Sequence, residues 1–148
     1  MYGSVAELRD RGFEHVYVEL ERYDGPVAGL ADVEGVPHYF SRDHDLSTDD
    51  HYFVWPADAA AVALEREQWR IFVAWKDRGG QKPHPGQGGV DARYDELQAL
   101  LEPERAVPDG ARRLVAEWSF ADDLDERWAP DGADYLVRWR EPVGLDRF

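Results

Sequence analysis

Residues 23–40 read YDGPVAGLADVEGVPHYF, and this stretch decides the fold that the sequence predicts. Asp24-Gly25-Pro26 is a turn signal, and two apolar segments then flank the pair Glu34-Gly35. A two-residue turn at Glu34-Gly35 predicts a β-hairpin. The turn also predicts the register, which pairs Val33 with Val36, Ala31 with His38, Leu30 with Tyr39 and Gly29 with Phe40.

This register gives the hairpin two distinct faces. The more apolar face carries Val33, Val36, Ala31, His38 and Phe40, so we expect His38 to be a packed and hydrogen-bonded histidine. The Phe40 ring can cover the bare backbone of Gly29. We expect the hairpin to be the core on which a helix docks.

Four further segments of the sequence are predicted to be strands. Val16, Val18 and Leu20 alternate with polar residues in 13–23, which predicts one buried face. Residues 51–56 are apolar on both faces, so they predict a central strand. Residues 112–120 and 134–141 alternate and predict the last two strands, with Leu114, Ala116, Trp118 and Phe120 on one face and Tyr135, Val137 and Trp139 together.

Three helices are predicted. The clearest spans 57–78, with Asp58 as its cap and Gly79-Gly80 at its end. A shorter one runs from Asp91 to Glu102 with Tyr94, Leu97, Leu100 and Leu101 inward, and a short one follows Ser4. The predicted fold is a single α+β domain over 1–148, a mostly antiparallel sheet of five to six strands with the long helix on one face. The Gly/Pro-rich residues 79–90 are the one candidate hinge.

Glu65 is an acidic residue on the apolar arc of the long helix, between Trp69 and Phe72. A buried carboxylate needs an arginine partner, or it takes up a proton. An ion pair with an arginine is one interpretation. The other is an acid/base pair of Glu65 with His38.

The segments YDGP and GLADVEGVPHYF, followed by a strand and a helix with Trp69, resemble a group of small bacterial proteins with a YDGP…AD..G.PHYF pattern. The resemblance covers about the first half of the chain. It implies that the hairpin-plus-helix unit recurs, and it implies no function and no catalytic residue.

Composition excludes several classes of function. The net charge of −14 argues against nucleic acid and anionic membranes as partners. The absence of cysteine excludes disulfides and zinc–thiolate sites. With no apolar run of membrane-spanning length and no signal-peptide pattern, we expect a cytoplasmic protein. The serines lie in no catalytic motif, and no glycine fingerprint of a nucleotide site is present.

The loop 42–51 is the candidate metal site. Asp43, Asp45, Ser47 and Asp49 alternate like the first ligands of a calcium loop, but the turn glycine and the final glutamate of that motif are missing. His44 and His51, together with His38, are alternative ligands for a divalent metal in a hydrolase. The other interpretation is a solvated loop.

Two acidic clusters predict a surface for a basic protein partner. They are Asp43/Asp45/Asp49/Asp50 and Asp122/Asp123/Asp125/Glu126, with Tyr52, Trp55 and Trp128 as aromatic anchors. Our first hypothesis is therefore a non-enzymatic acidic binding domain without a cofactor, of the kind that inhibits or neutralises a partner protein. The alternatives are the metal-assisted hydrolase and a small-ligand pocket between helix and sheet, lined by Trp69, Trp118 and Trp139.

Overall fold

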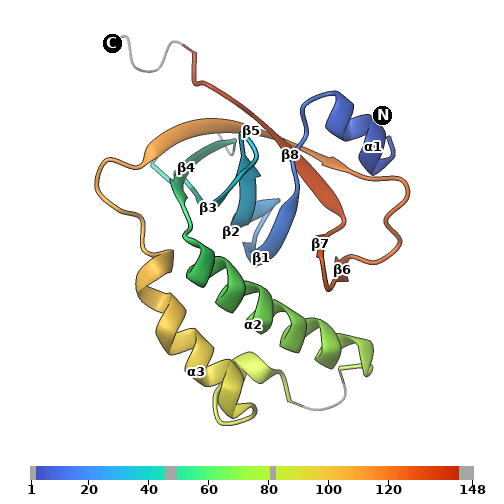
Figure 1. Cartoon of the computed structure of the whole chain (residues 1–148), viewed down its shortest axis with the longest axis vertical. Helices are drawn as coiled ribbons and strands as arrows, with labels where there is room; N and C mark the ends of the chain where they lie inside the picture. The colour runs from blue at the N-terminus through green and yellow to red at the C-terminus, as the bar shows by residue number, and fades with distance from the viewer. Residues whose placement is uncertain (1–2, 46–49, 81–82, 144–148) are drawn as a thin grey trace.

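We describe the fold from a computed structural model, which covers residues 3–45, 50–80 and 83–143. The fold is α+β, as predicted, and its centre is a six-stranded antiparallel sheet with the order β1-β2-β3-β4-β5-β8. Figure 1 shows that the sheet is strongly curled. The strands are β1 (Val16–Arg22), β2 (Pro26–Val33), β3 (Val36–Arg42), β4 (His51–Pro56), β5 (Arg112–Phe120) and β8 (Tyr135–Arg140).

The predicted hairpin is formed by β2 and β3, and every predicted pair is confirmed, from Val33 with Val36 to Gly29 with Phe40. Glu34 and Gly35 have φ values of 54° and 78°, as a two-residue turn of this kind requires. The carboxylate of Glu14 accepts hydrogen bonds from both turn amides, at 3.0 Å from Glu34 and 2.7 Å from Gly35. The turn is thus held from outside the hairpin.

The YDGP turn before β2 is also held by side chains. Arg42 is buried and donates hydrogen bonds to the carbonyl oxygens of Tyr23, Asp24 and Pro26, at 2.9, 3.1 and 3.1 Å. The hydroxyl of Tyr52 donates to the Pro26 carbonyl as well. This motif therefore has a structural role in fixing the entry to β2.

The curl brings the two edges of the sheet together and encloses an aromatic core. Strands β3 and β8 are three places apart in the sheet, which is about 14 Å in a flat sheet. The ring centroids of Phe40 and Trp139 are nevertheless only 6.1 Å apart. The backbone amide of Val137 donates to the Glu14 carbonyl at 3.1 Å, which links the two edges. Tyr52 and Trp118 complete this inner core.

The long helix covers the opposite, outer face of the sheet. Helix α2 (Ala59–Asp77) begins where predicted, because the Asp58 side chain accepts a hydrogen bond from the Ala61 amide at 2.8 Å. Its Trp69 packs in one cluster with Leu30 and Tyr39. The helix therefore docks on the Leu30–Tyr39 face of the hairpin, and His38 is on the other face, opposite Ala31.

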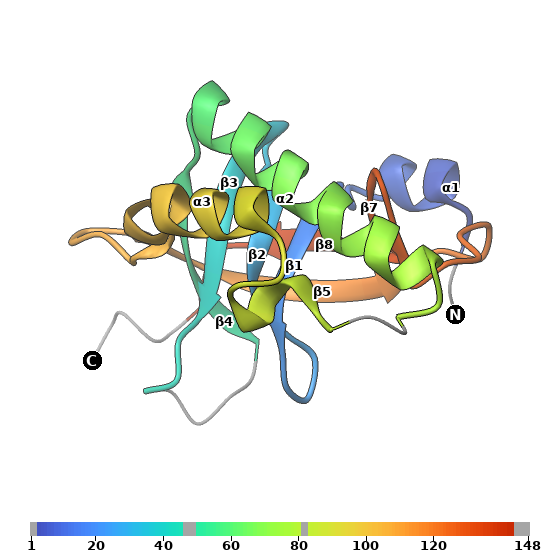
Figure 2. The same cartoon turned by 90° about the horizontal axis from the view of Figure 1, so that it is seen from below.

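The shorter helices complete the fold. α3 (Ala92–Leu101) lies beside α2 on the same side of the sheet (Figure 2), and α1 (Val5–Asp10) lies apart from them. The described connections include the 3-10 turns η1 (Pro85–Gln87) and η2 (Glu102–Arg105) and the two-residue strands β6 (Trp128–Ala129) and β7 (Gly132–Ala133). Within the described ranges, no helix combines the length and apolar character that crossing a membrane requires.

Two packing predictions are wrong. Val16 and Val18 were expected on one face, but the register shifts between them, so Val16 packs in the inner core and Val18 under α2. A bulge inserts an extra residue into one strand, so residues two apart on either side of the bulge no longer share a face. Leu100 is 53% exposed because the inward face of α3 consists of Leu97 and Leu101. Phe120 lies on the predicted face of β5, where its ring and that of Trp118 both contact Tyr135, although its side chain is 40% exposed at the end of the strand.

Candidate functional site

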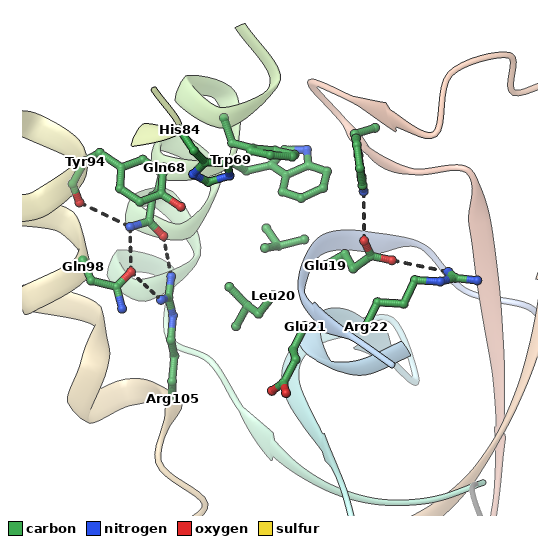
Figure 3. A pocket seen from close by; sticks show the side chains of 13 residues that line it. Glu19, Leu20, Glu21, Arg22, Gln68, Trp69, His84, Tyr94, Gln98 and Arg105 are labelled. Atoms are coloured by element: carbon green, nitrogen blue, oxygen red, sulfur yellow. Dashed lines mark hydrogen bonds and ion pairs between the residues drawn. The ribbon is translucent and has the colours of Figure 1, made fainter. Parts of the chain in front are cut away.

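A pocket of about 350 Å³ lies between strand β1 and the helices α2 and α3. Its volume is at the lower end of the range for small-molecule sites. Figure 3 shows one wall from β1 and a facing wall from the two helices. The lining residues are Val18, Glu19, Leu20, Glu21, Arg22, Gln68, Trp69, Phe72, His84, Tyr94, Gln98, Arg105 and Trp128.

The apolar part of the pocket is made by Val18, Leu20, Trp69, Phe72 and Trp128. The two indole rings are fixed by hydrogen bonds. Trp69 Nε1 donates to a backbone carbonyl of β6 at 2.7 Å, and Trp128 Nε1 donates to Glu19 at 2.9 Å. The rings of Phe72 and Trp128 meet edge to face at 5.1 Å. This surface is therefore held in place before any ligand arrives.

The polar part of the pocket is organised by a buried ion pair. Glu65 of α2 is fully buried, and Arg105 binds both oxygens of its carboxylate. Arg105 Nε donates to Oε2 at 2.8 Å and Nη2 donates to Oε1 at 2.7 Å. The Tyr39 hydroxyl also donates to Oε2 at 2.8 Å. Of the two predicted alternatives for Glu65, the structure shows the arginine partner. The proposed Glu65–His38 pair is wrong, because α2 docks on the face away from His38.

Arg105 also positions two glutamine side chains. Its Nη2 donates to Gln68 Oε1 at 2.6 Å and its Nη1 to Gln98 Oε1 at 3.1 Å. Gln68 Nε2 in turn donates to Gln98 Oε1 at 3.1 Å and to the Tyr94 carbonyl at 3.3 Å. Figure 3 shows this network on the helical wall. Trp55 donates to the carbonyl of Glu104 at 3.1 Å, which anchors the turn that carries Arg105.

Electrostatics keeps these groups in defined protonation states. Burial disfavours the charge of Arg105, but its bonds to Glu65 outweigh this and raise the arginine's pKa. Burial, and then the charge of Glu65, raise the pKa of Tyr39, so its hydroxyl remains a donor. Burial likewise raises the pKa of Tyr94. At neutral pH Arg105 therefore keeps its charge, and the phenols of Tyr39 and Tyr94 keep their protons.

His84 comes from the Gly/Pro-rich segment 79–90, the predicted hinge. Its ring packs against Trp75 at 4.7 Å and against Phe72 at 5.5 Å, and the adjacent Pro85 is buried. Its Nδ1 accepts a hydrogen bond from the Gly86 amide at 2.8 Å. The described part of this segment thus contributes one wall of the pocket.

The β1 wall carries the remaining charges. Glu19 accepts hydrogen bonds from Trp128 and, at 2.8 Å, from the Tyr135 hydroxyl, and Arg22 lies 3.5 Å away. Burial raises the pKa of Tyr135, and the charge of Glu19 adds to this effect. Glu21 is exposed at the rim and forms no ion pair within the described chain.

Among the described residues the candidate metal site is brought together only in part, because the Asp43 amide donates to the His51 carbonyl oxygen at 2.8 Å. His38 pairs with Pro56 at one end of the β3–β4 ladder, and His51 begins β4 at the other end, about 15 Å away. Asp43 is buried and pairs with Arg113 at 3.0 Å, while His44 and Asp45 are exposed. Ser47 and Asp49 lie outside the described residues. No three carboxylate or histidine groups in the described ranges are arranged to hold a metal.

The predicted partner surface is largely occupied by internal contacts. Tyr52 is fully buried, and Trp55 is 8% exposed and stacked on Tyr39, so neither side chain is available as a surface anchor. Trp128 is half-buried and forms a wall of the pocket.

The acidic clusters have mixed surroundings. Asp50 contacts His51 at 3.0 Å, Asp123 accepts from the Val5 amide at 2.9 Å and Glu126 pairs with Lys76 at 3.1 Å. Asp122 and Asp125 are exposed.

The pocket between helix and sheet is present, but only one of its three predicted tryptophans lines it. Trp118 and Trp139 pack in the inner core, on the opposite side of the sheet from Trp69. Sequence reasoning missed most of the polar lining, above all Arg105, Gln98, His84 and Glu19. The available signal was the pair Glu65 and Gln68, two polar residues one helical turn apart on a buried face.

No protein-family model, curated protein or solved structure matches this chain.

Proposed function

We propose that the protein binds a small organic ligand in the pocket between β1 and the helices α2 and α3. The observation that carries this proposal is the combination, in one pocket, of a fixed aromatic surface with a polar network that is anchored by the buried Glu65. Ligand sites commonly combine aromatic and apolar side chains with well-placed polar groups, and in this pocket the polar side chains outnumber the apolar ones. Because Trp69, Trp128 and Arg105 are already held by hydrogen bonds, binding would need little reordering of side chains.

A basic protein partner has less support. That hypothesis relied on aromatic anchors at the surface, and two of the three are buried. The net charge of −14 still favours cationic partners over anionic ones at long range. A charge of this kind affects association rates and solubility, and it does not by itself define a binding site.

The proposal is tested by filling the pocket. A collection of small aromatic and aliphatic compounds is screened against the wild-type protein by ligand-observed NMR. The binding of each hit is then measured with the variant Leu20→Trp. This substitution fills the pocket with a larger side chain and removes no polar group. The matched control is Leu124→Trp, the same substitution at a residue that is 38% exposed and does not line the pocket.

We expect Leu20→Trp to abolish binding and Leu124→Trp to preserve it. Thermal denaturation of both variants confirms that they are folded. If the compounds bind both variants equally well, or if none binds the wild type, the proposed function is wrong.

A further inference from the structure

The hydrogen-bond network of the helical wall indicates what kind of group it can receive. The Gln98 oxygen accepts from both Arg105 and Gln68, and this fixes which end of its amide is oxygen. The Gln98 NH₂ group therefore remains as a donor, and it has no partner within the described residues. The Gln68 amide is fully used by the network.

Arg105 and Tyr94 add donors to the same wall. A guanidinium has five N–H groups, and the network uses four, which leaves one N–H on Nη1 without a partner in the described chain. The Tyr94 hydroxyl also has no hydrogen-bond partner there, and its raised pKa keeps it protonated. In neutral His84, the proton is on Nε2, because Nδ1 accepts from the Gly86 amide.

Glu65, the ion-pair partner of Arg105, is buried and does not line the pocket. The Glu65 side chain is 0% exposed and the Arg105 side chain is 17% exposed, so the cation is the member of the pair that lines the pocket. Charged donors bind carboxylates more strongly than they bind neutral oxygens. At the rim, Glu21 provides an uncompensated negative charge.

We propose that the ligand is a small organic carboxylate, whose anionic group binds the Arg105, Gln98 and Tyr94 donors while its apolar body lies on Leu20 and Trp69. This inference rests on the proposed function and adds the chemical class of the ligand. A protonated amine has no acceptor to offer these donors, so it would form none of their hydrogen bonds.

The test uses three probes with one common body: 3-phenylpropanoate, 3-phenylpropanamide and 3-phenylpropylamine. Their affinities for the wild-type protein are measured by NMR titration at low salt. We expect the carboxylate to bind at least about tenfold more tightly than the amide and the amine, because only the carboxylate brings a negative charge to the Arg105 guanidinium.

Two variants test separately the hydrogen-bond donor of Tyr94 and the negative charge of Glu21, with little expected change to the fold. Tyr94→Phe removes a hydroxyl with no protein partner in the described chain, and it should weaken carboxylate binding about threefold to tenfold. Glu21→Gln removes the rim charge, and it should strengthen carboxylate binding severalfold and weaken any amine binding. The control is Asp10→Asn, the same change of charge on α1, away from the pocket lining, with a smaller expected effect.

The possible results separate the two proposals. Amine or amide binding as tight as that of the carboxylate, or a weaker carboxylate complex in Glu21→Gln, overturns the carboxylate inference and leaves the pocket as a binding site. The carboxylate inference is also overturned if none of the three probes binds while other compounds bind the wild type and lose binding in Leu20→Trp. If no compound of any class binds, both proposals are wrong.

Discussion

Glu65 is a buried acidic residue, and Arg105 is its ion-pair partner. Replacing it with leucine keeps a similar volume but leaves Arg105 without its carboxylate partner. We expect Glu65→Leu to lower the free energy of unfolding by about 3–5 kcal/mol, as observed when one member of a buried pair is removed. Urea denaturation followed by tryptophan fluorescence measures this change.

The control is Glu67→Leu, two residues along the same helix. Glu67 pairs with Arg93 where both side chains are 42% exposed, so solvent screens the pair and its loss should have little effect. The double variant Glu65→Leu/Arg105→Met removes both charges and should lose less than the sum of the single variants. Equal effects at Glu65 and Glu67 would contradict the assignment of a buried pair.

His15 gives stability a dependence on pH. Burial lowers its pKa below the ordinary value of 6.5, although the hydrogen bond to the Asp131 carbonyl opposes this. The unfolded chain therefore takes up a proton at higher pH than the folded chain. The stabilisation is complete above a pH of about 6.5 and is lost as the pH falls through that value towards the lower folded pKa.

We therefore expect the wild type to lose more stability than His15→Gln when the pH is lowered from about 7.5 to about 5.5. Glutamine can still donate to the Asp131 carbonyl but does not titrate. The measurement is the free energy of unfolding in urea at both values. Parallel losses in the two proteins would show that other groups cause the pH dependence.

The elements differ in how far the sequence predicts them. The β2–β3 hairpin is predicted residue by residue, because a two-residue turn and an alternating pattern are both local. The faces of β1 are predicted wrongly, because a bulge depends on the neighbouring strand. The pocket is harder still. Glu65 indicates that a cation is needed, but the chain folds back over 40 residues to supply Arg105, and no local pattern indicates which arginine that is.

At Gly29 the backbone of the hairpin closely approaches that of β1. A Cβ atom at this position would be 2.2 Å from the Val18 carbonyl oxygen and 2.7 Å from the Phe40 ring. Phe40 therefore covers Gly29, as predicted. We expect Gly29→Ala to lower the free energy of unfolding by roughly 3 kcal/mol, since a backbone atom cannot move away cheaply.

Phe40→Leu provides the background that separates the two clashes. If the backbone contact dominates, Gly29→Ala should remain strongly destabilising in the Phe40→Leu protein, measured by urea denaturation against Phe40→Leu alone. A negligible effect in that background would mean that the Phe40 ring alone restricts this position.

At the scale of the whole molecule, two electrostatic effects compete. The chain has 31 acidic and 17 basic residues, so its folded form concentrates a net charge of −14. Several ion pairs oppose this repulsion, such as Arg112 with Glu34 and Arg138 with Glu117. Most of them are exposed, and exposed pairs contribute little to stability.

Repulsion should therefore dominate, and added salt should stabilise the protein. We expect the free energy of unfolding to rise by on the order of 1 kcal/mol between about 10 mM and about 300 mM sodium chloride, as the screening length shortens. Potassium chloride should give the same result, because the effect depends on ionic strength. The double variant Asp10→Asn/Glu21→Gln should be more stable than the wild type at low salt, and the difference should shrink at high salt. A fall in stability with added salt would instead mean that the ion pairs outweigh the net charge.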